Sequence, residues 1–233
     1  IGSHGGRYET YWATSCVNCG PRYSIITELP YDRERTSMAQ FRTCPECTRE
    51  YTDPSSRRHH AQTIACERCG PRLRLLDREG NDVECSDVIK ETARLLDTGA
   101  LVAVRGIGGF HIACIEESAG ELKKRLGRSE QPFAIMVRTI DHVERIAKVS
   151  VTERLLLDSS SRPIVVLEKR DPTAHNEISN LHTLGCMLPY TGLHHLLFSN
   201  LAHPLLVMTS ANMPGYPMIT DIDRAMARLN RDV

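Results

Sequence analysis

Two Cys-x-x-Cys pairs, with eighteen residues between them, are the feature of this sequence that most constrains its fold. They are formed by Cys44 with Cys47 and by Cys66 with Cys69. Two such knuckles at this separation bring four thiolates within tetrahedral reach of one zinc ion, whereas a redox role or unliganded thiols would not require both spacings. We therefore predict a structural zinc site with four cysteine ligands.

The second knuckle belongs to an internal repeat. The pattern Cys-x-x-Cys-Gly-Pro-Arg over residues 16–22 recurs fifty positions later over residues 66–72, and each copy of a repeat is expected to be one structural unit. The same offset places the partner knuckle of the first copy before residue 1. We therefore expect a truncated first zinc unit, with Cys16 and Cys19 as half of its ligands, followed by a complete second unit. Alternatively, this pair is metal-free or borrows another ligand such as His4.

The composition narrows the class of protein. The chain has nine cysteines, and an odd number dominated by Cys-x-x-Cys pairs argues against a disulfide framework. We therefore expect a reducing, cytoplasmic compartment. Lys plus Arg and Asp plus Glu number 29 each, so no overall field favours nucleic acid or a membrane as partner.

One long stretch, Ile178 to Thr220, contains no Asp, Glu, Lys or Arg. It is not a membrane span, because prolines, histidines and asparagines interrupt it. Two interpretations stay open. The stretch is a run of buried strands and loops, or it is a site wall that is free of carboxylates so that an anionic ligand is not repelled.

After about residue 83 the sequence takes on an α/β pattern. Asp87 can cap a helix that Gly99 ends. Short apolar runs of the kind found in strands covered on both faces alternate with helix-like stretches. The runs lie at 101–104, 133–137, 163–167 and 205–208, and the helix-like stretches at 118–127, 140–148, 192–202 and 221–230. We predict a finger region over residues 1–83 and an α/β domain over residues 84–233.

Three features of the second domain are candidates for ligand binding. Glycines at 106, 108 and 109 follow an apolar run, and such a loop lets backbone N–H groups approach an anion, although a tight turn would explain it equally well. The residue at position 111 is His, so the loop is not a dinucleotide-binding Gly-x-Gly-x-x-Gly motif. Residues 209–212 (Thr-Ser-Ala-Asn) follow a predicted strand, where α/β sheets usually place ligands, and here too a simple turn is the alternative.

The third feature is a basic cluster of Lys123, Lys124, Arg125 and Arg128. It is either the solvated face of a helix or a clamp for a triphosphate, in which Arg is the better bidentate partner.

Together these motifs resemble one family. The Cys-Gly-Pro-Arg knuckles, Leu-Pro-Tyr-Asp-Arg at 29–33, Glu-Tyr-x-Asp-Pro at 50–54 and Arg-Arg at 57–58 closely resemble the zinc-finger region of the HypF family, the carbamoyltransferases of [NiFe]-hydrogenase maturation. Residues 106–113, 185–195 and 208–212 are similar to the YrdC-like domain that follows in that family. The resemblance covers nearly the whole chain from about residue 7.

The resemblance implies a zinc-ribbon-like finger region with four cysteine ligands, followed by a YrdC-like α/β domain with a twisted sheet. It also implies an internal fragment, without the family's N-terminal acylphosphatase-like and C-terminal transferase domains. The implied reaction forms carbamoyl-AMP from ATP, with Mg²⁺, and a carbamoyl donor derived from carbamoyl phosphate. The carbamoyl group then passes to the C-terminal Cys of the partner HypE. We do not expect complete turnover from this chain alone.

The resemblance also assigns site residues. We expect Arg128, Ser210 and Asn212 to act at the phosphates. The wider set for nucleotide and carbamoyl binding is Arg105, Gly106, Gly108, Gly109, His111, Lys124, Arg128, Thr191, Thr209, Ser210 and Asn212. The chain has Leu126 and Gln131 where the family usually has Lys. Losing these cations would weaken triphosphate binding unless a neighbouring Lys or Arg compensates.

Two other functions compete with this one. Threonylcarbamoyl-AMP synthesis for tRNA uses the same fold, but the zinc units are not part of that simpler enzyme. A non-catalytic zinc or RNA-binding module is the other alternative, because the finger region is locally basic. Its arginines include Arg22, Arg33, Arg35, Arg57, Arg58, Arg72 and Arg74.

Overall fold

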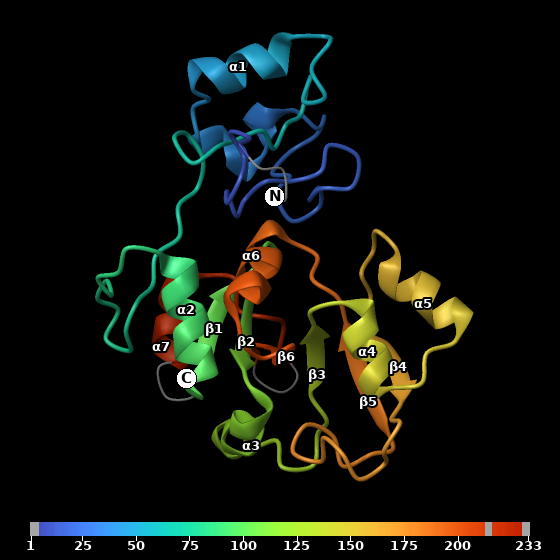
Figure 1. Ribbon diagram of the computed structural model, residues 1–233. Helices are drawn as coiled ribbons and strands as arrows, with labels where there is room; N and C mark the ends of the chain where they lie inside the picture. Colours follow the sequence, from blue (N-terminus) through green and yellow to red (C-terminus); the bar gives the residue numbers. More distant parts are fainter. Residues whose placement is uncertain (1–4, 213–215, 230–233) are drawn as a thin grey trace. The chain divides into compact units, whose positions relative to one another are not determined.

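The computed structural model describes residues 5–212 and 216–229, and the chain divides into two compact units (Figure 1). The first extends to Leu73 and includes Thr191–Leu196. The second comprises Arg74–Tyr190 and the chain from Leu197 onward. This division groups residues 74–83, which we had expected to belong to the finger region, with the second unit.

The first unit contains little regular structure. Its elements are η1 (Arg33–Arg35), η2 (Ser37–Gln40) and α1 (Pro45–Thr52). Its buried core is small and is made largely of the predicted zinc ligands together with Ala61 and Ile64. A core of this size contributes little hydrophobic stabilisation, so the unit depends on polar and metal cross-links.

One such cross-link is the guanidinium of Arg33. It donates hydrogen bonds to the backbone carbonyls of Gln62, Ile64 and Phe41 at 2.7, 2.8 and 2.8 Å. Arginine carries five N–H donors in a rigid fork, which suits it to satisfying several carbonyls at once. The side chain thereby joins the turns around η1 and η2 to the segment that precedes the second knuckle.

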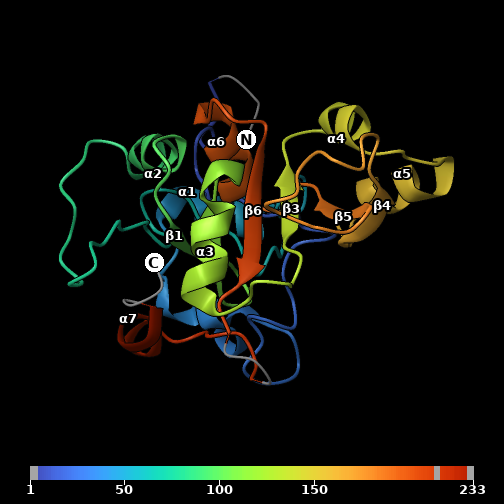
Figure 2. The ribbon, with the colours of Figure 1, turned by 90° about the horizontal axis from the view of Figure 1, so that it is seen from below.

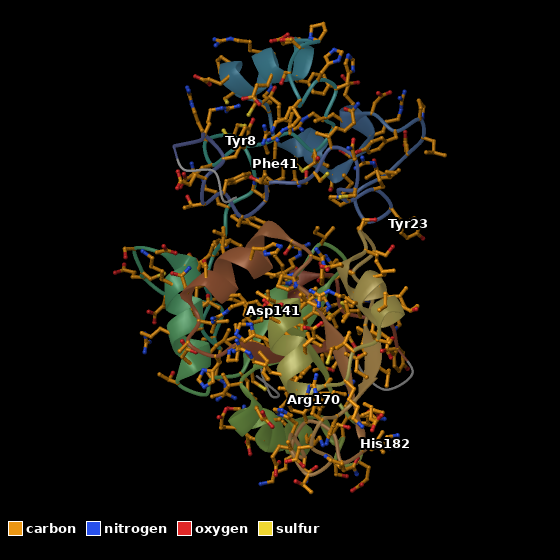
Figure 3. All side chains as sticks on the ribbon, turned by 45° about the vertical axis from the view of Figure 1, so that its right-hand side comes forward. Tyr8, Tyr23, Phe41, Asp141, Arg170 and His182 are labelled. Atoms are coloured by element: carbon orange, nitrogen blue, oxygen red, sulfur yellow. The ribbon has the colours of Figure 1, made fainter. Side chains whose placement is uncertain are left out.

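The two copies of the repeat adopt the same turn. Gly20 N–H donates to the carbonyl of Cys16 at 2.9 Å, and Gly70 N–H donates to that of Cys66 at 2.7 Å. A Cβ at Gly20 would lie 2.4 Å from the Cys16 oxygen, and one at Gly70 would lie 2.6 Å from the Cβ of Ala65. Only glycine fits at these positions. Between the copies, Tyr23 projects from the unit with 96% of its surface exposed (Figure 3).

The second unit is built on one six-stranded sheet with the order β1-β2-β6-β3-β5-β4 (Figures 1 and 2). All neighbouring strands are antiparallel except β3 and β5, which are parallel. The strands are β1 (Val102–Arg105), β2 (Phe110–Cys114), β3 (Ala134–Val137), β4 (Val165–Glu168), β5 (Thr183–Met187) and β6 (Leu205–Ser210). The predicted α/β class is confirmed.

Helices cover both faces of this sheet, and alternate residues of each strand point to opposite faces. On β6, Val207 belongs to one core cluster, while Leu206 and Met208 belong to the other. The first cluster includes residues of α3 (Ala119–Leu126), α4 (Ile140–Ile146), α5 (Val151–Asp158) and α7 (Ile222–Leu229). The second includes residues of α2 (Val88–Asp97) and α6 (Gly192–Asn200).

Strands β2 and β5 and helix α5 are absent from our sequence-based expectations. The residues of β2 directly follow the glycine loop, and we assigned them to no element. Helix α5 leaves Val151 and Leu155 exposed, so it lacks a clear amphipathic pattern. Its start does carry a capping box between Ser150 and Glu153, which is a recognisable sequence signature.

The cap of α2 provides a test of the fold. The Asp87 carboxylate accepts hydrogen bonds from the backbone N–H groups of Ile89 and Lys90 at 3.0 and 3.1 Å. We expect Asp87→Ala to lower the free energy of unfolding by about 1 kcal/mol, measured by urea denaturation. Glu84→Ala, which removes an exposed carboxylate nearby, should change it by less than about 0.5 kcal/mol. Equal effects would contradict the capping role.

Candidate functional site

The first unit brings four cysteine sulfurs together. The Sγ atoms of Cys44, Cys47, Cys66 and Cys69 all lie within 4.8 Å of one another. The separations are 3.8 Å for Cys44 to Cys66, 3.7 Å for Cys66 to Cys69 and 3.6 Å for Cys69 to Cys47. With Zn–S bonds of about 2.3 Å, a tetrahedral zinc ion requires sulfurs about 3.8 Å apart. The donor set and its spacing therefore fit zinc.

Local structure positions these ligands. Cys44 is the residue before α1, and Pro45 at the first helical position fixes the turn between it and Cys47. Cys47 is fully buried, and burial raises the pKa of its thiol to about 12. Burial alone therefore favours the protonated thiol. A bound divalent cation favours the thiolate instead, because thiolates are its ligands.

Cys16 and Cys19 are not part of this cluster. Both are exposed, and they lie in the first copy of the repeat. Their assignment as half of another metal site stays a prediction. Cys114 and Cys186 are buried in the second unit, and burial raises the pKa of each thiol to about 12. These two are inert core thiols.

In the second unit, Arg128 reaches the carboxyl end of β6. Helix α3 ends at Gly127, which adopts a left-handed conformation (φ 63°) and turns the chain back toward the sheet. The Arg128 guanidinium donates to Thr209 Oγ1 at 3.4 Å, to the Asn212 carbonyl at 2.7 Å and to Asn212 Oδ1 at 3.3 Å. Ser210 Oγ also donates to Asn212 Oδ1, at 2.7 Å. The structure thus brings together the residues expected to act at phosphates.

His111 is the sheet neighbour of Ser210, because the register of β2 and β6 pairs these two residues. The Nδ1 atom of His111 is buried and has no hydrogen-bond partner among the residues that the structure describes. Burial lowers the pKa of this imidazole, so it is neutral at pH 7. A neutral ring with an unused nitrogen is suited to a hydrogen bond with a ligand.

The glycine loop connects β1 to β2 beside this histidine. Gly106 N–H donates to the Gly109 carbonyl at 2.8 Å, and a Cβ on Gly106 would lie 3.5 Å from His111 Nδ1. Gly109 has φ 148°, and a Cβ there would lie 2.8 Å from the Ile219 carbonyl oxygen. Gly108 has open space around it. Arg105, at the end of β1, is exposed, with its guanidinium 5.9 Å from the centre of the Phe110 ring.

The other predicted cations do not converge with Arg128. Lys123 is buried with its Nζ 6.0 Å from the centre of the Phe133 ring, and Arg125 pairs with Glu121 at 2.9 Å. Lys124 is exposed.

The remaining predicted positions carry no charged side chain. Leu126, one of the two positions where the family usually has Lys, packs against the core, and Gln131 is exposed. Thr191 lies in the segment grouped with the first unit, where its Oγ1 accepts a hydrogen bond from His194 N–H at 3.2 Å. Its role toward a ligand stays a prediction.

Sequence reasoning missed the groups around the sulfurs. Arg7 donates to Cys47 Sγ at 3.3 Å and pairs with Glu50 at 2.7 Å. Cys47 and Glu50 lie three residues apart on one face of α1, but this helix is also absent from our sequence-based expectations. The contribution of Arg7 has no comparable local signature.

Known proteins resemble this chain over nearly its whole length. Carbamoyltransferase HypF of Rhodobacter capsulatus is 43% identical over 228 residues, which are 97% of this chain and 30% of that protein. Probable carbamoyltransferase HypF of Methanocaldococcus jannaschii is 46% identical over 230 residues, with coverages of 96% and 30%. The chain therefore spans about 30% of the length of these curated relatives.

Solved structures agree. The crystal structure of T. kodakarensis HypF matches with a TM-score of 0.94 and 43% identity over 99% of this chain and 31% of that one. Full-length HypF in a phosphate- and nucleotide-bound form matches with a TM-score of 0.91 and 40% identity, with coverages of 99% and 30%. E. coli YciO, at 18% identity and a TM-score of 0.52, covers 63% of this chain and 74% of its own and shares the fold alone.

The clustered cysteines and the mixed sheet define a YrdC-like α/β protein with a cysteine-rich finger region. The model of the Sua5/YciO/YrdC family, described as "Telomere recombination", matches residues 94–233, and the model of the HypF finger matches residues 2–26 and 43–76. The chain belongs to the HypF family, and the resemblance stated from its motifs is confirmed. Over the described residues, the helices are too short or too polar to cross a bilayer.

The sulfur cluster yields a test of metal binding. We expect the chain to bind one zinc ion and Cys47→Ser to abolish this binding, because the fully buried Cys47 supplies one of four ligands. The measurement is metal content by mass spectrometry after gel filtration. The matched control is the double variant Cys16→Ser, Cys19→Ser, which removes an exposed pair and should leave the zinc content unchanged. Two fully bound zinc ions per chain would contradict this account.

Proposed function

We propose that this chain is the part of a carbamoyltransferase that binds ATP and a carbamoyl donor and forms carbamoyl-AMP. The observation that carries this proposal is the convergence of Arg128 on Thr209 and Asn212 at the carboxyl end of β6. A cationic fork beside hydroxyl and amide groups suits phosphate binding. The similarity to a HypF structure in a phosphate- and nucleotide-bound form supports the same assignment.

The chemistry needs positioning more than proton transfer. The donor arrives as carbamate, and its anionic oxygen attacks the α-phosphorus of ATP. A new P–O bond forms, the bond from the α-phosphorus to the bridging oxygen breaks, and pyrophosphate leaves with the electron pair. Negative charge spreads over the phosphate oxygens, so fixed cations and N–H or O–H donors stabilise the transition state. We assign that role to Arg128, Ser210 and Asn212.

The carbamoyl end would lie near the glycine loop. Gly108 has open space where a side chain would stand, so a ligand can approach the loop backbone there, and His111 contributes a ring nitrogen that is buried and unpartnered among the described residues. We propose that this loop encloses the carbamoyl group and limits hydrolysis of the adenylate, and the expected role of Thr191 toward that group stays a prediction.

Other cations would serve the triphosphate. Lys124 is exposed at the end of α3, and we propose that it and Arg105 compensate for the missing lysines at positions 126 and 131. Mg²⁺ would accompany ATP and neutralise phosphate charge, held chiefly by the phosphate oxygens.

We propose that the carbamoyl group passes to the C-terminal Cys of a HypE-like acceptor, and that the protein acts in the cytoplasm. The name carbamoyltransferase, carried by relatives that are 43 and 46% identical, supports a carbamoyl acceptor. All nine cysteines lie in the described part of the chain and form no disulfide there, which suits a reducing compartment. The zinc site would stabilise the finger region without taking part in the chemistry.

A paired assay tests the proposed reaction. The zinc-loaded chain is incubated with ATP, Mg²⁺ and either carbamoyl phosphate with carbamate, or threonine with bicarbonate. We expect pyrophosphate and carbamoyl-AMP in the first mixture. Product only with threonine would favour threonylcarbamoyl-AMP synthesis. Salt-sensitive RNA binding without nucleotide binding would favour a zinc or RNA-binding module.

The phosphate role of Arg128 is tested by substitution. We expect Arg128→Gln to weaken ATP binding by about 10- to 100-fold, because a hydrogen bond to a charged group contributes about 1.5–3 kcal/mol. Isothermal titration calorimetry measures the affinity. Arg125→Gln is the matched control, since this guanidinium pairs with Glu121 and should leave the affinity within about twofold of the unsubstituted chain. Equal losses in both variants would indicate only a general effect of charge.

A further inference from the structure

A guanidinium from the start of the chain lies against the sulfur cluster. Arg7 Nη1 is 3.3 Å from Cys47 Sγ and 3.8 Å from Cys44 Sγ, within hydrogen-bonding range of both sulfurs. Arg7 precedes the first copy of the repeat, while these two cysteines form a knuckle of the complete site. Arg7 is 37 residues from Cys44 and 40 residues from Cys47 in sequence, so the contact joins two distant segments of the chain.

Two groups hold Arg7 in this position. Glu50 lies three residues after Cys47 on α1 and accepts a hydrogen bond from Arg7 Nη2 at 2.7 Å. Tyr8 accepts a hydrogen bond from the same nitrogen at 2.6 Å and donates to Glu50 at 2.9 Å. The Tyr8 hydroxyl itself lies 3.9 Å from Cys47 Sγ. One face of α1 thus presents a sulfur and the carboxylate that orients the cation beside it.

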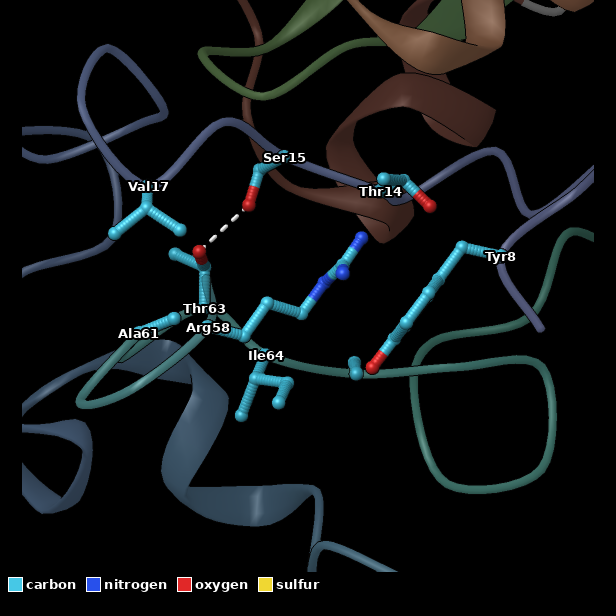
Figure 4. Close-up of a pocket in the computed structure, with 9 residues that line it drawn as sticks. Tyr8, Thr14, Ser15, Val17, Arg58, Ala61, Thr63 and Ile64 are labelled. Carbon is cyan, nitrogen blue, oxygen red and sulfur yellow. Dashed lines mark hydrogen bonds between the residues drawn. The ribbon is translucent and has the colours of Figure 1, made fainter. Parts of the chain in front are cut away.

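A second arginine supports Tyr8. The Arg58 guanidinium lies over the Tyr8 ring, 3.7 Å from its centre, and 3.7 Å from Glu50. Figure 4 shows Arg58 extending toward the ring of Tyr8. The hydrogen-bonded hydroxyls of Ser15 and Thr63 lie on the side of Arg58 that faces away from Tyr8. Stacking on one face of the ring restricts its rotation. Contacts with Glu50 and Arg58 therefore orient the donors that face the sulfurs.

The sulfurs need such donors. Zinc bound by four thiolates carries a net charge of about −2, and Cys47 is fully buried, so water cannot solvate its share of that charge. A charged N–H donor stabilises buried negative charge more strongly than a neutral one. It also lowers the availability of the sulfur lone pair to protons and to electrophiles.

We propose that Arg7 is a positioning residue of the zinc site, oriented by Glu50 and Tyr8, that stabilises the zinc-bound thiolate of Cys47 and slows the loss of zinc. The segment before the first Cys-Gly-Pro-Arg knuckle thereby stabilises the metal centre of the second copy of the repeat. This role is independent of the adenylate chemistry proposed for the second unit.

Zinc release is the first measurement. The zinc-loaded chain and its variants are mixed with a chromogenic chelator at neutral pH and in mild acid. Substitution of residues that support metal ligands typically costs about 10- to 100-fold in metal affinity, and we expect Arg7→Gln to release zinc at least about tenfold faster. Arg68→Gln is the matched control. It removes a guanidinium that is 70% exposed and pairs with Glu46 beside the same knuckles, and it should stay within about twofold.

Cobalt substitution separates an effect on sulfur from a loss of folding. In the Co²⁺-loaded chain, loss of the N–H donor raises the energy of the sulfur lone pairs, so Arg7→Gln should move the sulfur-to-cobalt charge-transfer band to longer wavelength. Arg7→Lys retains a charged donor, so its band should shift less than that of Arg7→Gln. If Arg7→Gln folds poorly, Arg7→Lys and Tyr8→Phe still report, each with a smaller shift in the same direction. An unchanged band and unchanged zinc release in these variants, or equal changes in Arg68→Gln, would overturn the proposal.

Discussion

The pairing of β6 is the interaction on which the second unit depends. This strand is antiparallel to β2 on one side and to β3 on the other, so it joins the β1–β2 pair to the β3–β5–β4 group. Its interior residues Leu206 and Val207 are fully buried, and its carboxyl end places Thr209 and Ser210 near Arg128. A slip of one residue in register would exchange the faces of Thr209 and Ser210. The same pairing therefore sets both the core and the geometry of the candidate phosphate site.

The first unit depends on a different kind of constraint. Its apolar core consists largely of the cysteines themselves. Arg33 donates hydrogen bonds to backbone carbonyls that regular secondary structure would otherwise satisfy, and Arg7 donates to a cysteine sulfur. Metal binding and folding are therefore coupled in this unit. The second unit has clusters of buried side chains on both faces of its sheet and needs no such cross-link.

The parts that were predictable from the sequence are those that local spacing determines. The clustering of Cys44, Cys47, Cys66 and Cys69 and the capped helix after Asp87 follow from short-range patterns, and the structure places them as expected. The missed strand β2 lies directly after a glycine loop, and the contact of Arg7 with Cys47 spans forty residues. Such features depend on tertiary pairing, for which a single sequence carries no local pattern. Family resemblance, and not periodicity, led us to expect Arg128 and Asn212 at the same phosphates, and their direct hydrogen bond was not predicted.

The charge-free stretch from Ile178 to Thr220 has a consequence for folding. It contains β5, α6 and β6, and β6 lies at the centre of the sheet. Strand β6 pairs with β2 and β3, which lie far from it in sequence, so its burial requires long-range contacts, and such contacts form slowly. Charged residues and prolines next to apolar strands normally oppose intermolecular β-pairing. The stretch has no charged residue, so Pro204, directly before β6, is the residue of this kind beside that strand. Aggregation during synthesis or refolding would therefore begin in this stretch, and its rate would depend on how quickly β2 and β3 capture β6.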